Sequence, residues 1–264
     1  MKKLIWMSIF SVVISGAYAQ KTSNFKIGVE FGQGSVEGDY SDKWNIRQDL
    51  ITSLYDHGLF SSRAAYAQSD FFYWGIKPQV SLWNDRVNLY SGLRFTMFDS
   101  NLGDRNGTNF FYLRTTNPDA VEFYKIFLIK EETAYLSVPL EMSYTIFHSN
   151  ILTPNITVSF YGKAGMEIGL SIFSKRNVNF VSTTMQSHEH EVLNSVEQPN
   201  KLYSTLYGAL GGQLTIGNGI QFNVEGIIPS QILTKNHNSI IEPDTFSGVQ
   251  LSVQFPLSMF IKNN

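Results

Sequence analysis

The feature that most constrains the fold is a strict alternation of side chains between Tyr135 and Ile146. In the run YLSVPLEMSYTI, every second residue from Leu136 onward is apolar or aromatic, and the residues between them are mostly polar. Successive side chains of a β-strand point to opposite faces, so this run predicts a strand with one apolar and one polar face. It is also longer than the five or six residues that are typical of strands in soluble sheets.

Seven other segments alternate in the same way, which makes the chain a succession of two-faced strands. The next segment follows after a short connection, and its apolar face includes Val158, Met166 and Leu170. With the frame of each segment chosen to favour the alternation, no charged residue falls on an apolar face. The eight segments are 24–32, 71–82, 86–98, 134–147, 155–171, 205–216, 220–228 and 248–258.

Two fold classes explain this pattern, and the lengths of the connections distinguish them. A soluble sandwich would bury the apolar faces, whereas a membrane barrel exposes them to lipid and turns the polar faces inward. The connections 83–85, 148–154 and 217–219 are short and alternate with long ones; the last, 229–247, is intermediate. Short turns at one rim and long loops at the other are typical of outer-membrane barrels. The sequence therefore predicts an all-β, antiparallel up-and-down transmembrane β-barrel of eight strands, with short periplasmic turns and long extracellular loops.

The long connections leave some structure open. Residues 109–114 and 121–130 read as strands around the turn signal Asn117-Pro118-Asp119. We expect them to extend the third and fourth strands above the membrane, but as two more spanning strands they would raise the count to ten. Apolar residues at helical spacing predict a short surface helix over 41–58.

Prolines and aromatic residues refine this barrel. Pro78 and Pro139 fall inside strands, where each removes a hydrogen-bond donor from the ladder, so we expect a bulge or local irregularity at each. Aromatic side chains are expected in two belts at the membrane interfaces. The periplasmic belt would hold Phe25, Tyr144, Phe160, Phe222 and Phe255, and the outer belt Phe72, Trp74 and Phe95.

The N-terminal residues predict where the protein goes. Lys2 and Lys3 precede an apolar stretch over 4–14, and Ala17-Tyr18-Ala19 supplies a small-x-small cleavage site. This pattern is typical of a secretory signal peptide, with an uncleaved anchor as the alternative. We expect residues 1–19 to be the signal peptide and residues 20–264 to form a single outer-membrane barrel domain. No internal apolar run reaches the ~18 residues of a membrane helix.

Two motifs resemble those of small outer-membrane β-barrel proteins of the "porin family" or PorT-like type. The run YLSVPLEMSY is similar to the Tyr-Leu-x-Ile-Pro-Leu run of that family, and FYGKAGMEIGLSI is similar to the glycine-rich strand that follows it. The resemblance implies an eight-stranded barrel in the outer membrane of a Gram-negative cell envelope. Some members of the family serve protein secretion, and the resemblance supplies no catalytic residues.

The charged residues of the polar faces form the candidate site. An eight-stranded barrel has an interior just wide enough to be filled by side chains, and unpaired charges are costly there. Arg94 and Glu141, and Glu141 and Lys163, lie on neighbouring strands and are expected to pair. The balance of charges favours a lumen closed by salt bridges over a conducting path or a proton relay. The predicted network comprises Lys26, Glu30, Lys77, Arg94, Glu141, Lys163, Glu167 and Glu225.

Other chemistry is weakly indicated. The tract Ser187-His188-Glu189-His190-Glu191 could offer ligands to a metal ion, but its spacing matches no common site, and a solvated tract is the preferred interpretation. A hydrolase would need Ser, His and an acidic residue together, whereas the pair His148-Ser149 falls in a predicted turn and the histidines of the loops, including His237, have no fixed geometry. We expect no enzyme activity, no cofactor and no metal. A formal charge of −2 without a basic cluster gives no reason to expect nucleic acid as a partner.

The predicted extracellular loops carry aromatic residues that would form either a contact surface for a partner or a cap. They are Trp44, Phe110, Phe111, Tyr112, Phe123, Tyr124 and Phe127. Three functions remain open: a structural or surface-binding barrel, an accessory barrel of a protein-secretion or envelope-assembly machine, and a small pore. The expected partners are outer-membrane lipid and, through the loops, other envelope or secretion proteins.

Overall fold

The computed structural model describes residues 24–40, 44, 67–83, 85–103, 110–114, 123–150, 156–196, 198–217, 219–234 and 236–260. Most of them belong to strands. The elements are β1 (Phe25–Tyr40), β2 (Ala67–Leu82), β3 (Val87–Tyr90), β4 (Leu93–Gly103), β5 (Phe111–Arg114), β6 (Phe123–Asn150), β7 (Ile156–Phe180), η2 (Thr183–His188), α3 (Glu189–Asn194), β8 (Leu202–Ile216), β9 (Ile220–Ile232), β10 (Ile241–Pro256) and η3 (Leu257–Met259).

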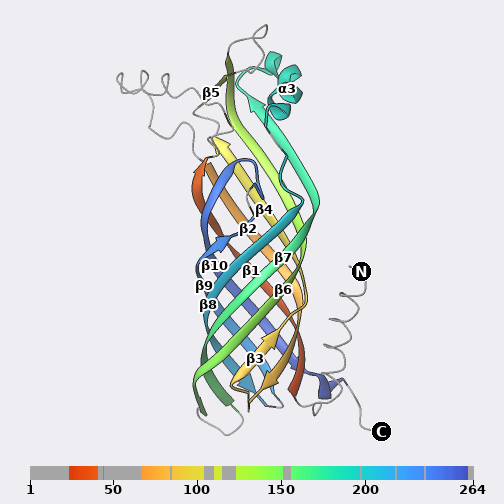
Figure 1. Cartoon of the computed structure of the whole chain (residues 1–264), viewed down its shortest axis with the longest axis vertical. Coiled ribbons are helices and arrows are strands. Elements are labelled where there is room, and N and C mark those ends of the chain that lie inside the picture. Colours follow the sequence, from red (N-terminus) through yellow and green to blue (C-terminus); the bar gives the residue numbers. More distant parts are fainter. Residues whose placement is uncertain are drawn as a thin grey trace, which may run out of the picture.

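The strands close into a ring of eight positions, which confirms the predicted antiparallel barrel (Figure 1). The last strand, β10, pairs with β1 along its whole length, so the sheet has no free edge in the ring. β3 and β4 share one position between β2 and β6, with β3 near the short turns and β4 above it. The alternative of ten spanning strands is wrong, because β5 is a four-residue strand that pairs only with the start of β6.

The outer wall of the barrel is apolar and its inner face is polar. Along β6, Leu140 and Met142 are 52% and 53% exposed, whereas Glu141 between them is 4% exposed. A row of outward cross-strand neighbours, Asp70–Asp99–Glu132–Lys175, ends this apolar belt on one side. Exposed large apolar side chains around a closed barrel are stable only in contact with lipid, so the belt marks the membrane-spanning part.

The two ends of the barrel differ in their connections. At the turn end, strands are joined by short connections; Trp83 and Asp85 have φ of 51° and 64°, and Gly217 and Gly219 have φ of 55° and 96°. Backbone with positive φ lets the chain reverse in a few residues. The opposite end, which we call the loop end, carries the longer connections.

Strands at the loop end are longer than the alternation predicted. β6 has 28 residues and β7 has 25, and their ladder continues to the pair Ile126↔Phe180 (Figure 1). Above the belt the outer face is no longer apolar, so the two-residue period of hydrophobicity ends before the strand does. We call β5, residues 123–127 and 178–180, η2 and α3 the projecting tip.

The irregularity expected at the two prolines is present, although it is not a bulge at either proline. Pro139 stays in register opposite Glu167, and Pro78 stays in register opposite Ile27. The interruption lies in the strand between them, at Ser91–Gly92, which separates β3 from β4. Each proline offers no N–H to that strand, so the ladder breaks there.

Two predictions fall on residues outside the described part of the chain. They are the signal peptide over 1–19 and the surface helix over 41–58, of which only Trp44 is described. Among the described helices, none is long and apolar enough to cross a membrane.

Candidate functional site

The candidate site is a layer of charged side chains that crosses the lumen at mid-height. Its members point inward from six of the strand positions, and all are buried. They are Glu30 on β1, Lys77 on β2, Arg94 on β4, Glu141 on β6, Lys163 and Glu167 on β7, and Glu225 on β9. The structure thus brings together all the residues of the predicted network except Lys26.

Arg94 is the centre of the layer. Its Nε donates to Glu30 at 2.8 Å, one terminal nitrogen donates to Glu141 at 2.9 Å, and the other donates to Glu167 at 2.6 Å. The guanidinium also lies over the ring of Tyr73, 4.3 Å from its centroid. The planar fork of arginine offers five donors in fixed directions, which suits it to join carboxylates from several strands.

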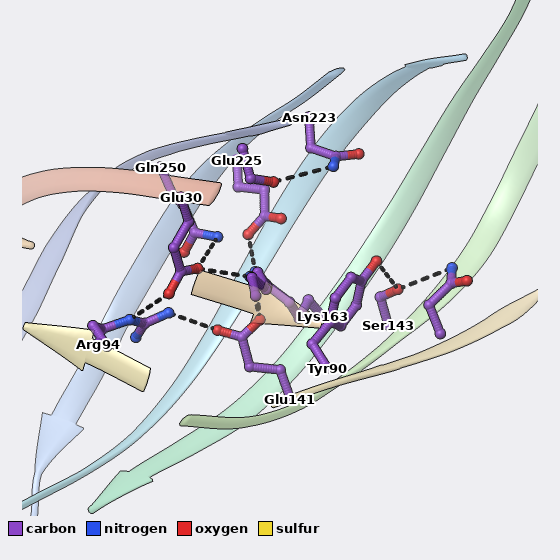
Figure 2. A network of polar contacts seen from close by, with 12 residues as sticks. Glu30, Tyr90, Arg94, Glu141, Ser143, Lys163, Asn223, Glu225 and Gln250 are labelled. Carbon is purple, nitrogen blue, oxygen red and sulfur yellow. Dashed lines mark hydrogen bonds and ion pairs between the residues drawn. The ribbon is translucent and has the colours of Figure 1, made fainter. Parts of the chain in front are cut away.

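Two lysines complete the layer, and Figure 2 shows one of them, Lys163, beside Glu141 and Glu225. Lys77 Nζ lies 2.9 Å from Glu30 and 2.5 Å from Glu141. Lys163 Nζ lies 3.1 Å from Glu141 and also contacts Glu225. Glu141 therefore touches all three cations, which makes it the counterpart of Arg94 on the acidic side.

Neutral side chains occupy the remaining acceptor sites of the carboxylates. Tyr207 donates to Glu141 at 2.5 Å, Tyr161 donates to Glu225 at 2.7 Å, and Gln250 donates to Glu30 at 3.1 Å. Ser137 and Thr96 both donate to Glu167. Buried charges are tolerated where ion pairs and hydrogen bonds satisfy them together, and that condition is met here.

Lys26 lies apart from the layer, near the turn end. It takes part in none of the ion pairs just described and lines a cavity of about 850 Å³ whose rim includes Asp85, Arg86 and His148. His148 and Ser149 belong to the end of β6, and His148 lines this cavity.

The loop end of the lumen is filled instead by aromatic rings. Phe98 packs edge-on against Tyr135 and Tyr203, and Phe71 packs against Phe98 and Phe246. In the alternation of each strand, these inward aromatic residues fall at the positions of the polar, inward-facing side. Large rings at such positions were the available signal for a packed rather than an open interior.

The sequence indicated the loop aromatic residues as one possible cap, but it did not predict that the connection between β9 and β10 would cover these rings. The connection between β9 and β10, of which we call residues 233–240 the cap loop, turns inward, and its residues 237–240 are all at most 5% exposed. Asn238 Nδ2 donates to Ser100 at 2.7 Å, and its Oδ1 accepts from the backbone N–H groups of Ile240 and Ile241. Trp44 donates from its indole to the Ser239 carbonyl at 2.7 Å.

Two titratable groups of the cap region have shifted pKa values. Both lie beyond the Asp70–Lys175 row that ends the apolar belt. Glu131 accepts from the backbone N–H and hydroxyl of Ser239, and burial raises the pKa of its carboxyl above the ordinary value. His237 is wholly buried beside Phe98, with ring centroids 5.0 Å apart, and burial lowers the pKa of its imidazole to about 3. Both shifts arise because burial disfavours the charged form.

The histidine- and glutamate-containing tract is helical, and its side chains are exposed or half-buried, as expected of a solvated tract. It ends η2 and forms α3, where Glu189 accepts from the backbone N–H of Val178 at 2.9 Å, and His188 lies 3.3 Å from Glu191. Within the described residues no group of three or more potential ligands is placed to hold a metal ion.

The loop aromatic residues divide into a buried group and a partly exposed group. Trp44, Phe111 and Tyr124 are buried in the interior of the loop end. Phe110, Tyr112 and Phe123 are partly exposed at the projecting tip, where their rings stack edge to face. Lys125 lies 5.5 Å from the ring centroids of both Phe110 and Tyr112.

Comparison with known proteins shows similarity of fold alone. No protein-family model and no curated protein matches the chain. The N-terminal β-barrel domain of Pseudomonas aeruginosa OprF is 12% identical, with 88% of this chain and 98% of that chain covered and a TM-score of 0.35. Ail, the attachment invasion locus protein of Yersinia pestis, is 10% identical over 87% and 95%, with a TM-score of 0.30. The transport unit of the autotransporter AIDA-I from Escherichia coli is 7% identical over 88% and 89%, with a TM-score of 0.24. Scores this low say nothing about ligand or activity.

Proposed function

We propose that this chain is an integral outer-membrane β-barrel protein with a closed, non-conducting lumen, which presents the projecting tip to partners outside the cell. The observation that carries the closed lumen is the charged layer. Arg94 alone contacts Glu30, Glu141 and Glu167, which come from three other strands. An ion that crossed this layer would have to break several buried ion pairs at once.

A second barrier at the loop end supports the same proposal. The aromatic rings around Phe98 and the cap loop above them fill the lumen between the charged layer and the loop end. Opening a conducting path would require the cap loop to leave and the charged layer to rearrange. A small pore is therefore the less favoured function.

Planar-bilayer recording tests the closed lumen. The full mature chain, refolded into detergent and added to the bilayer, is expected to give no reproducible conductance steps, while a general porin in the same bilayer gives them. Regular steps from the wild-type chain at neutral pH would contradict the proposal. The variant Asn238→Ala, which removes the side-chain hydrogen bonds of Asn238 in the cap loop, is also expected to stay closed, because the charged layer remains.

The proposed orientation places the turn end in the periplasm and the projecting tip outside the cell. It rests on the apolar belt, the short turns and the predicted signal peptide over residues 1–19. Mass spectrometry of the outer-membrane protein should give a mature N-terminus at Gln20. Protease added to intact cells should cut the projecting tip and leave the turn at Trp83 untouched. The reverse pattern of cleavage would contradict the orientation.

The projecting tip is the proposed contact surface, and no enzyme activity is proposed. Phe110, Tyr112 and Phe123 offer aromatic surface beside the ammonium of Lys125. A photo-crosslinking residue at position 112 should capture a partner in intact cells, whereas the same residue at Trp83 should not. A captured secretion or envelope-assembly component would favour the accessory-barrel function, and equal capture at both positions would contradict a specific surface.

A further inference from the structure

The turn end of the lumen contains a chamber that the closed-barrel function leaves unused. The cavity of about 850 Å³ reaches the rim at the short turns, where Asp85 and Arg86 line it. Lys26, Ser159 and Gln221 line its wall. Four residues further along each of the same strands, the next but one inward side chain belongs to the charged layer; these are Glu30, Lys163 and Glu225. The chamber is therefore open at the rim and closed by the charged layer, and we call it the vestibule.

One wall of the vestibule region pairs most of its polar groups internally, although Oε1 of Gln79 has no partner among the described residues. On β2, β3 and β6, Asn88 accepts from Gln79 at 3.0 Å and from Ser81 at 2.7 Å, and it donates to Ser143 at 3.4 Å. Tyr90 also lies within hydrogen-bond distance of Ser143. Most polar atoms on this side are therefore already engaged with one another.

The opposite wall, on β8, β9 and β10, is different. Gln213 and Gln221 line the cavity and are 7% and 6% exposed, yet Nε2 of Gln213 and Oε1 of Gln221 have no partner among the described residues. Next to them, Asn223 Oδ1 and both amide atoms of the fully buried Gln254 are also unpartnered there. Buried polar atoms are nearly always hydrogen-bonded, so we expect Gln213 and Gln221, which line the cavity, to find partners inside the vestibule.

Charged side chains lie near the mouth of the vestibule. Lys26 is 6% exposed, lines the cavity near the rim and belongs to no ion pair of the charged layer. Arg86 brings another cation to the rim, and Asp85 is the acidic group beside them. Primary amides both donate and accept hydrogen bonds, whereas an ammonium donates only. The vestibule thus combines neutral amides on its wall with an ammonium near its mouth.

From this arrangement we propose that the vestibule binds small carboxylates that also carry an amide, such as acylated amino acids or the carboxyl end of a peptide. The carboxylate meets Lys26, and the amide pairs with Gln213 and Gln221. The volume lies within the 300–1,000 Å³ range that is usual for small-ligand sites. Because the chamber lies on the turn side of the charged layer, binding requires no passage through the barrel.

Solution NMR of the full mature chain in detergent micelles tests the proposal, with N-acetylglycine as the probe. Its addition should shift the side-chain amide signals of Gln213 and Gln221 in a saturable manner. Acetate, which lacks the amide, and acetamide, which lacks the carboxylate, should each bind about tenfold or more weakly, equivalent to one lost polar contact. Absence of a saturable shift with N-acetylglycine would overturn the proposal, since the orphaned amides would then be served by water alone.

Variants separate the two halves of the site. Lys26→Gln should weaken N-acetylglycine about tenfold and leave acetamide unchanged. The pair Gln213→Leu and Gln221→Leu should weaken acetamide and leave acetate unchanged. Lys125→Gln at the projecting tip is the matched control and should change nothing. Equal N-acetylglycine affinity in wild type and Lys26→Gln would overturn the assignment, even if the double variant failed to fold. Conductance from the wild-type barrel would contradict the proposed function but leave this test intact.

Discussion

The two ends of the lumen differ in how their interior is filled. At the loop end, Phe98, Tyr135 and Tyr203 pack against one another under the cap loop. The polar groups of Asn238 and Ser239 are paired there, and of the cap loop only the ring nitrogens of His237 are buried without a partner among the described residues. At the turn end, Gln213 and Gln221 line a cavity, Gln254 pairs across the ladder with Gln221, and all three keep unpartnered amide atoms within the described part of the chain. The loop end is a packed aromatic core, and the turn end is a polar chamber.

Connection length explains the difference. The chain between β9 and β10 is long enough to fold back into the barrel mouth, where it brings its own hydrogen-bond partners. The turn between β8 and β9 is only the few residues after Ile216, and those between the other turn-end strands are also short. A short turn cannot reach far inward, so among the described residues no loop pairs with the unpartnered amide atoms at that end. The charged layer separates the two environments.

The largest effect is expected from removing the layer itself. Arg94→Ala leaves Glu30, Glu141 and Glu167 without their shared cation, and breaking a buried ion pair in this way costs about 3–5 kcal/mol. Thermal unfolding in detergent, followed by heat-dependent gel mobility, should show a clear loss of stability. Glu141→Ala should behave alike. Lys130→Met, which removes a surface ion pair with Glu132, is the control. An unchanged melting temperature for both layer variants would contradict a structural role for the network.

Two amide substitutions, Asn238→Ala at the loop end and Gln221→Leu at the turn end, compare the two ends of the lumen, and the larger effect is expected at the loop end. Asn238→Ala at the loop end leaves the backbone N–H groups of Ile240 and Ile241 buried and unpaired, so it should cost about 2–3 kcal/mol. Hydrogen exchange at these two amides should accelerate more than exchange in the middle of β9. Unchanged exchange would show that the cap loop is held by packing alone.

Acid should loosen the loop end before the rest of the barrel. His237 has its pKa lowered to about 3, so below its ordinary value of 6.5 the released cap loop takes up a proton that the closed one does not. The closed state should lose about 1.4 kcal/mol for each pH unit between those values. Glu131 acts in the opposite direction, because its raised pKa favours protonation in the closed state as the pH falls.

Hydrogen exchange of Ser239 at pH 7 and pH 5.5 measures this effect. Exchange rates corrected for their intrinsic pH dependence should rise at the lower pH. In His237→Phe, which keeps a ring against Phe98 without a titratable group, the corrected rate should no longer rise at the lower pH, because only the opposite effect of Glu131 remains. The same pH dependence in both proteins would assign the effect to another group.

The smallest effect is expected at the turn end. Gln221→Leu replaces an amide whose Oε1 is unpartnered, so it should change stability by less than about 1 kcal/mol. Measuring the loss of melting temperature in Gln221→Leu and in Asn238→Ala compares the two ends of the lumen directly. A loss as large as that of Asn238→Ala would show that the vestibule amides are structural.

Much of the fold was predictable because it follows from local pattern. The alternation in 134–147 and its seven counterparts identified every spanning strand, and the connection lengths gave the topology. The inward charges were identified by their frame, since Arg94, Glu141 and Lys163 occupy the polar face of their strands. The sequence also predicted that residues 121–130 extend the fourth strand above the belt, and β6 does begin at Phe123. The end of β7 at Phe180 was not predictable, because above the belt neither of its faces needs to be apolar.

The sequence by itself determined a barrel of eight two-faced strands and which side chains would enter its lumen, since period, charge and turn length act between near neighbours. Only the tertiary structure decided how those side chains divide along the axis. Arg94 and Glu167 are far apart in sequence, and Lys26 differs from Lys77 only in its height on a strand. Height depends on strand register and barrel closure, which are properties of the whole ring. The same is true of the cap loop, whose inward turn becomes favourable only once Glu131, Ser100 and Trp44 stand around it.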